Sequence, residues 1–256
     1  MIVREHSNTF IVIEQDNHAH ISAEIINNFR EDFLNGKAFR KSVMYAIYMH
    51  DFGWKAFDTQ PFWNDEKQAP YTFIDFPTPA KVVLYQHGID VVEQQDAYAA
   101  LLCSEHYTRF LLHDNANESQ AFVKQEKERQ QRIIAAFPDF DQQAFDFHYG
   151  LLQLCDNLSL YLCLNEPNVA KGNVHPFFRD GISLSPALHV FSQSKMQLSW
   201  LNEETIKMNE SPLLNDLTIK LKQKSVRKER IFDEGLIKAY QSAPLQTVPI
   251  HLLANK

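Results

Sequence analysis

The stretch MYAIYMHDFGWK, from Met44 to Lys55, ends an apolar helical pattern in an adjacent histidine and aspartate, His50 and Asp51. At helical spacing, both polar residues follow apolar positions such as Val43 and Ile47, so both lie along the buried side of the predicted helix. Burying a carboxylate without a partner is costly in free energy. The pair is therefore either a helix end with a solvated acid beside a core histidine, or part of a metal site.

Composition limits the classes of protein to consider. The chain has 256 residues, 45% of them hydrophobic, which is enough for one large domain or for one domain with a small appendage. It carries 25 basic and 32 acidic residues, and the net charge of −7 disfavours nucleic-acid binding because such a surface repels phosphate backbones. The three cysteines lie in apolar helical contexts and are typical of reduced core residues. With no visible signal peptide or membrane span, we expect a cytoplasmic protein.

Two regions differ in hydrophobic periodicity. Helical spacing dominates residues 18–164, with helices expected at about 18–34, 39–51, 79–87, 96–113, 118–137 and 141–164. After about residue 180, alternating segments such as ALHVF, TIKMN and DLTIKLKQ predict short strands. The expected fold is mainly α. A helical metal-binding domain spans residues 1–175, and a small antiparallel β-sheet from residues 176–256, which the N-terminal strand can join, packs on it.

Other polar residues are expected to face the same interior. His18 shares a helical face with Ile21 and Ile25, whereas His20 falls on the polar face. Asp156 lies within the apolar run LLQLCDNLSLYLCL, so it is either a hydrogen-bonded structural acid or a ligand neutralised by a cation.

A single inward histidine is more often a core residue than a ligand, but here the candidates come from five separate predicted helices. They are His18, His50, Asp51, His87, His106 and Asp156. Imidazole and carboxylate ligands together suit Fe, Mn, Zn or Ni rather than a thiolate zinc site. The sequence therefore predicts a divalent transition metal inside the helical region.

The order H…HD…H…H…D formed by these residues resembles the pattern of the HD superfamily of metal-dependent phosphohydrolases, including the two extra histidines of members with two metals. The strings HDFGWK, ALLCSEHYTRF and LCDNLSLYLC look like an uncharacterised bacterial branch of it, a domain of unknown function. The resemblance covers roughly residues 10–166 and implies one or two bound ions. It assigns one ion to His18, His50, Asp51 and Asp156, and a second ion or a substrate phosphate to His87 and His106.

The resemblance implies metal-assisted hydrolysis of a phosphate ester, either a nucleotide or a simple phosphomonoester or diester. Asp51 would be a ligand and, together with Asp156, would orient the attacking water. Members often carry a basic residue near the His-Asp pair, and here the candidates are Lys55 and Arg109. Arg109 could grip a phosphate or form a surface ion pair with Glu105. The alternative function is a metal-binding or ligand-binding sensor that does not turn over a substrate.

The expected partner is a small phosphorylated molecule, with no membrane involved, and a homo-oligomer is compatible with the sequence. The basic run KLKQKSVRKER, from Lys220 to Arg230, could contact nucleic acid. Alternation explains it more simply, with Lys220 and Lys222 facing water and protecting a sheet edge. The aromatic segment between Phe52 and Pro79 either walls a ligand pocket or packs on itself as an aromatic mini-core.

Overall fold

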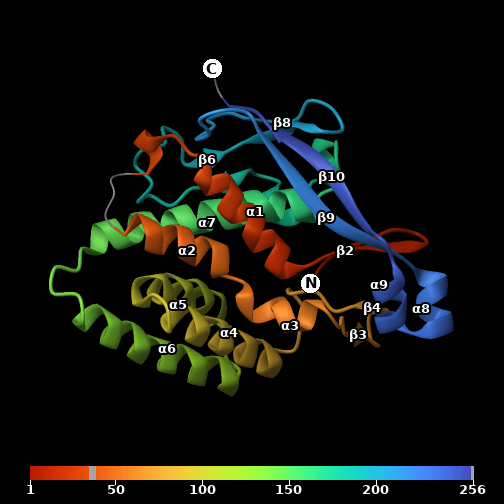
Figure 1. Cartoon of the computed structure of the whole chain (residues 1–256), viewed down its shortest axis with the longest axis horizontal. Coiled ribbons are helices and arrows are strands. Elements are labelled where there is room, and N and C mark those ends of the chain that lie inside the picture. Colours follow the sequence, from red (N-terminus) through yellow and green to blue (C-terminus); the bar gives the residue numbers. More distant parts are fainter. Residues whose placement is uncertain (35–38, 255–256) are drawn as a thin grey trace.

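The computed structural model describes residues 1–34 and 39–254. The helices of its first two thirds are α1 (Gln15–Asn27), α2 (Arg40–Met49), α3 (Lys55–Asp58), α4 (Thr78–Glu93), α5 (Ala97–Leu111), α6 (Asn117–Ala135) and α7 (Gln142–Leu164), with 3₁₀ turns η1 (Glu31–Phe33), η2 (Phe52–Trp54), η3 (Lys171–Asn173) and η4 (Pro176–Phe178). Helices α1 and α2 pack on α7, and α4, α5 and α6 form a layer on the other side of α2 (Figure 1).

Most predicted helices begin within about three residues of their starts in the structure, and capping side chains fix two of these starts. The helix predicted at 18–34 ends earlier, at Asn27. The Asp96 carboxylate accepts a hydrogen bond from the backbone N–H of Ala99 at the start of α5. Asp141 caps α7 in the same way. Helix α4 runs further than predicted, because Ile89 and Val92 continue its buried face.

The strands form one curled six-stranded sheet in the order β1-β2-β9-β10-β8-β7. Its strands are β1 (Ile2–Glu5), β2 (Thr9–Ile13), β7 (Leu198–Trp200), β8 (Thr205–Met208), β9 (Leu217–Arg227) and β10 (Leu245–Leu252). All neighbours are antiparallel except β8 and β10, which run parallel. The short pairs β3 (Trp63–Asn64) with β4 (Ala69–Pro70), and β5 (Ile182–Ser183) with β6 (Lys195–Met196), are separate. Two further helices, α8 (Lys228–Glu234) and α9 (Leu236–Ser242), connect β9 to β10.

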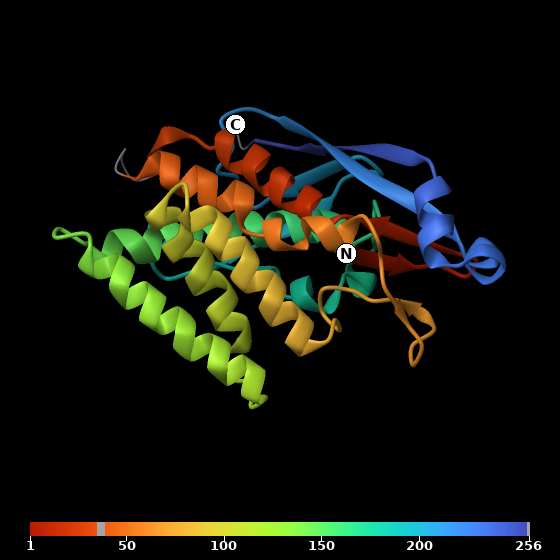
Figure 2. The ribbon, with the colours of Figure 1, turned by 60° about the horizontal axis from the view of Figure 1, so that its bottom comes forward.

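Helix α1 lies between this sheet and the other helices, with β9 and β10 crossing over it (Figure 2). One hydrophobic core contains residues from β1, the helices and β9, which ties the two ends of the chain to the helical region. The boundary predicted at residue 175 stays a prediction. In the described ranges, no helix combines the length and apolarity needed to cross a membrane.

The predicted fold class, mainly α with a small antiparallel sheet, is wrong. The sheet is mixed and six-stranded, and its centre is the eleven-residue strand β9. The prediction failed because apolar alternation in β9 stops at Leu221, whereas hydrogen bonding continues to Arg227 against β2. Conversely, the alternating residues 187–191 form turns and no strand, although Leu188 and Phe191 are buried.

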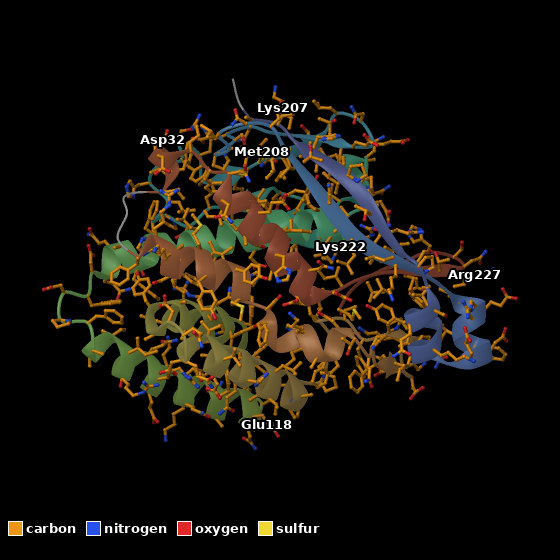
Figure 3. The ribbon with its side chains drawn as sticks, in the orientation of Figure 1. Asp32, Glu118, Lys207, Met208, Lys222 and Arg227 are labelled. Atoms are coloured by element: carbon orange, nitrogen blue, oxygen red, sulfur yellow. The ribbon has the colours of Figure 1, made fainter. Side chains whose placement is uncertain are left out.

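The basic run lies on β9 and α8, where Figure 3 labels Lys222 and Arg227. Lys220 and Lys222 are exposed as predicted, but they protect no edge, because β9 is an interior strand. Three other cations of the run form ion pairs with glutamates, namely Arg227 with Glu229, Lys228 with Glu5 and Arg230 with Glu234.

Candidate metal centre

Five of the predicted ligands meet in the helical core. His18 comes from α1, His50 from the end of α2, Asp51 from the turn into η2, His106 from α5 and Asp156 from α7. All five side chains are buried. In the described ranges they make up two overlapping sets of potential ligand atoms, His18 with His50 and Asp51, and His50 with His106 and Asp156. These residues could therefore hold a metal ion.

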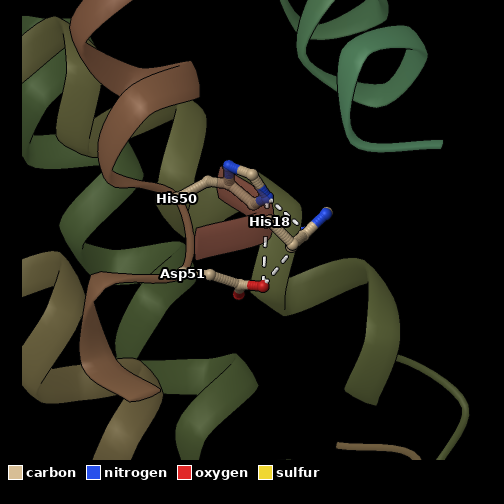
Figure 4. Close-up of side chains that lie close together, drawn as sticks. All are labelled: His18, His50 and Asp51. Carbon is tan, nitrogen blue, oxygen red and sulfur yellow. Dashed lines mark hydrogen bonds and ion pairs between the residues drawn. The ribbon is translucent and has the colours of Figure 1, made fainter. Parts of the chain in front are cut away.

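Five distances that join donor atoms of His18, His50, Asp51 and Asp156 are close to those expected between ligands of a metal ion. The Nε2 atoms of His18 and His50 are 3.1 Å apart, and His18 Nε2 lies 3.4 Å from Asp51 Oδ2 and 3.1 Å from Asp156 Oδ1 (Figure 4 shows the first three residues). His50 Nε2 lies 3.9 Å from Asp51 Oδ2 and 3.5 Å from Asp156 Oδ1. Ligands bound at about 2.0–2.2 Å in tetrahedral geometry are separated by roughly 3.3–3.6 Å. The observed distances scatter around that range.

The hydrogen bonds behind the two histidines fix their tautomers. His50 Nδ1 lies 2.7 Å from the carbonyl oxygen of Ile47, which can only accept, so Nδ1 carries the hydrogen. The Ser159 hydroxyl donates its one hydrogen to the carbonyl oxygen of His18 at 2.7 Å. Its oxygen therefore accepts from His18 Nδ1 at 2.8 Å. Both Nε2 atoms consequently present lone pairs beside two carboxylates, an arrangement that needs a cation or a shared proton. Histidine ligands are commonly supported in this way.

Two residues that the sequence did not single out hold Asp51. Gln15, the first residue of α1, donates to its Oδ2 at 2.7 Å, and the Tyr107 hydroxyl donates to its Oδ1 at 3.0 Å. Gln15 precedes His18 by three residues, and Tyr107 directly follows His106. Helical spacing could therefore have predicted that both side chains lie near the candidate ligands. The predicted ligand Asp51 is thus already fixed in orientation on both oxygens.

Without a metal ion, His18 carries a proton that it shares with the carboxylates of Asp51 and Asp156. Burial opposes protonation of His18, but Asp156 and Asp51 outweigh it and raise the pKa of His18 to about 9. Burial alone would raise the pKa of Asp156, but His18 and His50 hold that pKa well below its usual range. His106 lies further out, with Nε2 3.9 Å from Asp156 Oδ2, and burial lowers its pKa to about 4. His106 is therefore neutral.

The structure does not bring His87 or Lys55 into this group. His87 is exposed on α4, with its ring 6.3 Å from the ring of Phe52. The Lys55 side chain is also exposed, with Nζ 3.6 Å from Asp16. Sequence spacing failed for His87 because α4 turns Leu84 and Tyr85 inward and presents the histidine to solvent.

Arg109 forms the ion pair with Glu105 and also lies beside the centre. Its Nε donates to Glu105 Oε1 at 2.7 Å, and its guanidinium stacks on Tyr149 at 4.6 Å. Arg109 nevertheless lines a cavity of about 340 Å³ whose walls include Asp51, His106 and Asp156. The position of Arg109 is therefore compatible both with an ion pair to Glu105 and with a contact to a phosphate in the cavity.

Lys81 of α4 lines the same cavity and was missed by the sequence reasoning. Its ammonium donates to the carbonyl oxygen of Ile74 at 2.8 Å, and burial lowers its pKa. That hydrogen bond uses one of three ammonium hydrogens. The cavity therefore has two cationic side chains, Lys81 and Arg109, on walls that also carry the two carboxylates.

Most aromatic residues between Phe52 and Pro79 pack on one another. Phe76 is the centre of this mini-core, with its ring 5.6 Å from that of Phe62 and 5.7 Å from that of Tyr71. Trp54 joins it at 5.4 Å and also lines the cavity. Most of the segment therefore forms the aromatic mini-core, while Trp54 and Phe73 also line the cavity.

Comparison with known proteins gives a family but no function. Residues 1–228 match the family model described as "Protein of unknown function (DUF3891)", which spans the whole candidate centre. No curated protein and no solved structure matches the chain. The match covers well over half of the sequence, and the chain therefore belongs to the DUF3891 family.

Proposed function

We propose that the protein is a metal-dependent hydrolase of phosphate esters. One observation carries this proposal: the two Nε2 lone pairs of His18 and His50 meet the carboxylates of Asp51 and Asp156 at the wall of a cavity that also holds Lys81 and Arg109. Such a donor set fits a divalent transition metal such as Fe, Mn, Zn or Ni. The order of these residues, which resembles that of the HD superfamily, supports the same chemistry.

The two overlapping ligand sets are best explained by one ion. They share His50, whose Nδ1 is committed to Ile47, so only its Nε2 is available to both sets. One nitrogen lone pair cannot bind two ions. His106 then either completes the coordination of that ion or faces the substrate. The second ion that the resemblance allows would have needed His87, which is exposed.

A bound divalent ion would acidify the attacking water and polarise a phosphoryl oxygen. The chain's own groups would position the reactants. Lys81 and Arg109 would hold the phosphate oxygens by charge-assisted hydrogen bonds. The oxygen of water forms a bond to phosphorus, and the ester P–O bond breaks with its electron pair going to the departing oxygen. The attacking water gives up a proton and the departing oxygen takes one up, so the products are an alcohol and a phosphate.

Gln15 is suited to orient the attacking water. Its Nε2 is used by Asp51, whereas its Oε1 is buried with no hydrogen-bond partner in the described part of the chain. A buried acceptor without a donor costs about 1–3 kcal/mol. Since Gln15 lines the cavity beside Asp51, a water held there would donate one hydrogen to Oε1 and leave its lone pair for phosphorus.

Metal analysis followed by a phosphatase assay tests the proposal. Purified protein should contain about one transition-metal ion per chain, and His50→Ala and Asp51→Ala should lose it. His87→Ala is the matched control, because that exposed histidine lies outside the group and should retain the ion. The loaded protein should then release phosphate from a panel of phosphomonoesters, diesters and nucleotides. A metal-retaining protein that cleaves none of them would instead be the sensor, and unchanged metal in all three variants would remove the site.

A further inference from the structure

Three large apolar side chains are exposed around the cavity that holds the candidate centre. Phe110 at the end of α5 is 58% exposed, Phe177 of η4 is 55% exposed and Ile74, in the loop before α4, is 46% exposed. All three line the cavity. Single exposed apolar residues are ordinary, but three from separate elements at one opening are typical of a ligand site.

Five further residues that line this cavity are aromatic. They are Trp54, Phe73, Tyr85, Tyr107 and Tyr149. Tyr85 and Tyr107 stack with ring centroids 4.0 Å apart, and both are buried. These rigid side chains give the cavity flat faces without requiring ordering when a ligand binds.

Charge and size restrict the ligand further. A divalent ion together with Lys81 and Arg109 exceeds the two negative charges of Asp51 and Asp156, so the loaded cavity is positive even after Glu105 pairs with Arg109. Its volume of about 340 Å³ is near the low end of the roughly 300–1,000 Å³ usual for ligand sites. It therefore has room for one phosphoryl group and a small organic group.

We propose that the substrate is a small phosphomonoester whose organic part is a flat apolar ring. The phosphoryl group would lie at the ion with Lys81 and Arg109, and the ring would pack between Phe110, Phe177 and Ile74. This inference rests on the proposed hydrolase function for the position of the phosphate. A compact sugar phosphate would leave the apolar rim in contact with water.

The contributions of the ring and of the phosphoryl group to binding can be measured separately with two phosphonates, which the protein cannot hydrolyse. Isothermal titration of the metal-loaded protein should show phenylphosphonate binding about tenfold or more tighter than methylphosphonate, from the extra apolar area buried. Phe110→Ala and Phe177→Ala should remove most of that difference and leave methylphosphonate binding unchanged. Both residues are exposed, so the variants should fold. Phe232→Ala is the matched control, since Phe232 of α8 is 92% exposed and does not line the cavity.

The outcomes distinguish this inference from the proposed function. Equal affinity for the two phosphonates, or an unchanged preference in the Phe110→Ala and Phe177→Ala variants, would overturn the aromatic substrate while leaving a phosphate site. If neither phosphonate binds to protein that retains its metal, both proposals fail. A loss of preference in Phe232→Ala as well would show that the effect does not come from the rim and would overturn the assignment.

Discussion

The hydroxyl of Ser159 on α7 donates to the carbonyl oxygen of His18 on α1 and accepts from the Nδ1 of the same residue. Ser159→Ala should therefore weaken metal binding about 10–100-fold, because the His18 ring loses the partner that sets its orientation and tautomer. Competition with a chromogenic chelator measures this affinity. Ser22→Ala is the control, since Ser22 donates only to the His18 carbonyl, at 3.2 Å. Equal losses in the two variants would contradict the role of the ring hydrogen bond.

The metal-free protein should lose stability as the pH rises from about 6.5 to about 9. The pKa of His18 is raised to about 9, so its protonated form is favoured in the folded state. Protonation of His18 therefore contributes at most about 3 kcal/mol to the free energy of unfolding. This contribution is fully present below about pH 6.5 and is lost above about pH 9. Urea unfolding of chelator-treated protein at several pH values measures it.

The same proton competes with a metal ion, so metal affinity should increase over this pH interval. His18→Gln should abolish the pH dependence of unfolding, and His87→Ala should retain it. A metal-free protein whose stability is constant from pH 6.5 to pH 9 would show that the carboxylates do not hold a proton on His18.

Gly53 should tolerate no side chain, because a Cβ at this position would lie 2.1 Å from the carbonyl oxygen of Leu84 on α4. Gly53→Ala should destabilise the protein by about 1–3 kcal/mol or more and weaken metal binding, since η2 follows Asp51 directly. Chemical denaturation and the chelator assay measure the two effects. Gly172→Ala should change neither, since, apart from Gly172 and its two chain neighbours, no atom of residues 1–34 or 39–254 lies within 4 Å of the added Cβ. Normal stability in Gly53→Ala would mean that α4 and η2 are not held at this contact.

Gln15 and Tyr107 each donate to Asp51, and Gln15 also offers a buried acceptor, Oε1, that has no hydrogen-bond partner among the described residues. Gln15→Met should therefore lower the rate of phosphate release about 10–100-fold more than Tyr107→Phe does, with similar metal content in the two variants. Steady-state kinetics and elemental analysis together measure this. If the two variants lose activity equally, Gln15 acts only by supporting Asp51.

Sequence periodicity predicted the helices well and the sheet poorly, for different physical reasons. A helix closes its hydrogen bonds within itself, so local signals such as the Asp96 and Asp141 caps fix its position. A strand needs a partner that can come from anywhere in the chain. The pairing of Phe10 with Val226, across more than 200 residues, leaves no trace in either segment.

The same distinction applies to the candidate centre. Inward-facing apolar stripes predicted the burial of His18, His106 and Asp156, and the structure brings these residues together. The spacing argument failed for His87, because the predicted helix ended at this residue, whereas α4 continues to Glu93 and its buried face is set by Leu84, Tyr85 and Ile89. Lys81 carried no signal, since a lysine among apolar residues is ordinarily a solvated one.

Residue chemistry and the local helical period were enough to predict which side chains can act as ligands, that they lie in helices or at a helix end, and that most of them face inward. Which of these side chains meet depends on contacts between segments that are distant in the chain. The distances between His18, His50, Asp51 and Asp156 depend on how α1, α2 and α7 pack. That packing also sets the tautomers through Ser159 and Ile47, and it places Lys81, Arg109 and the apolar rim around one cavity.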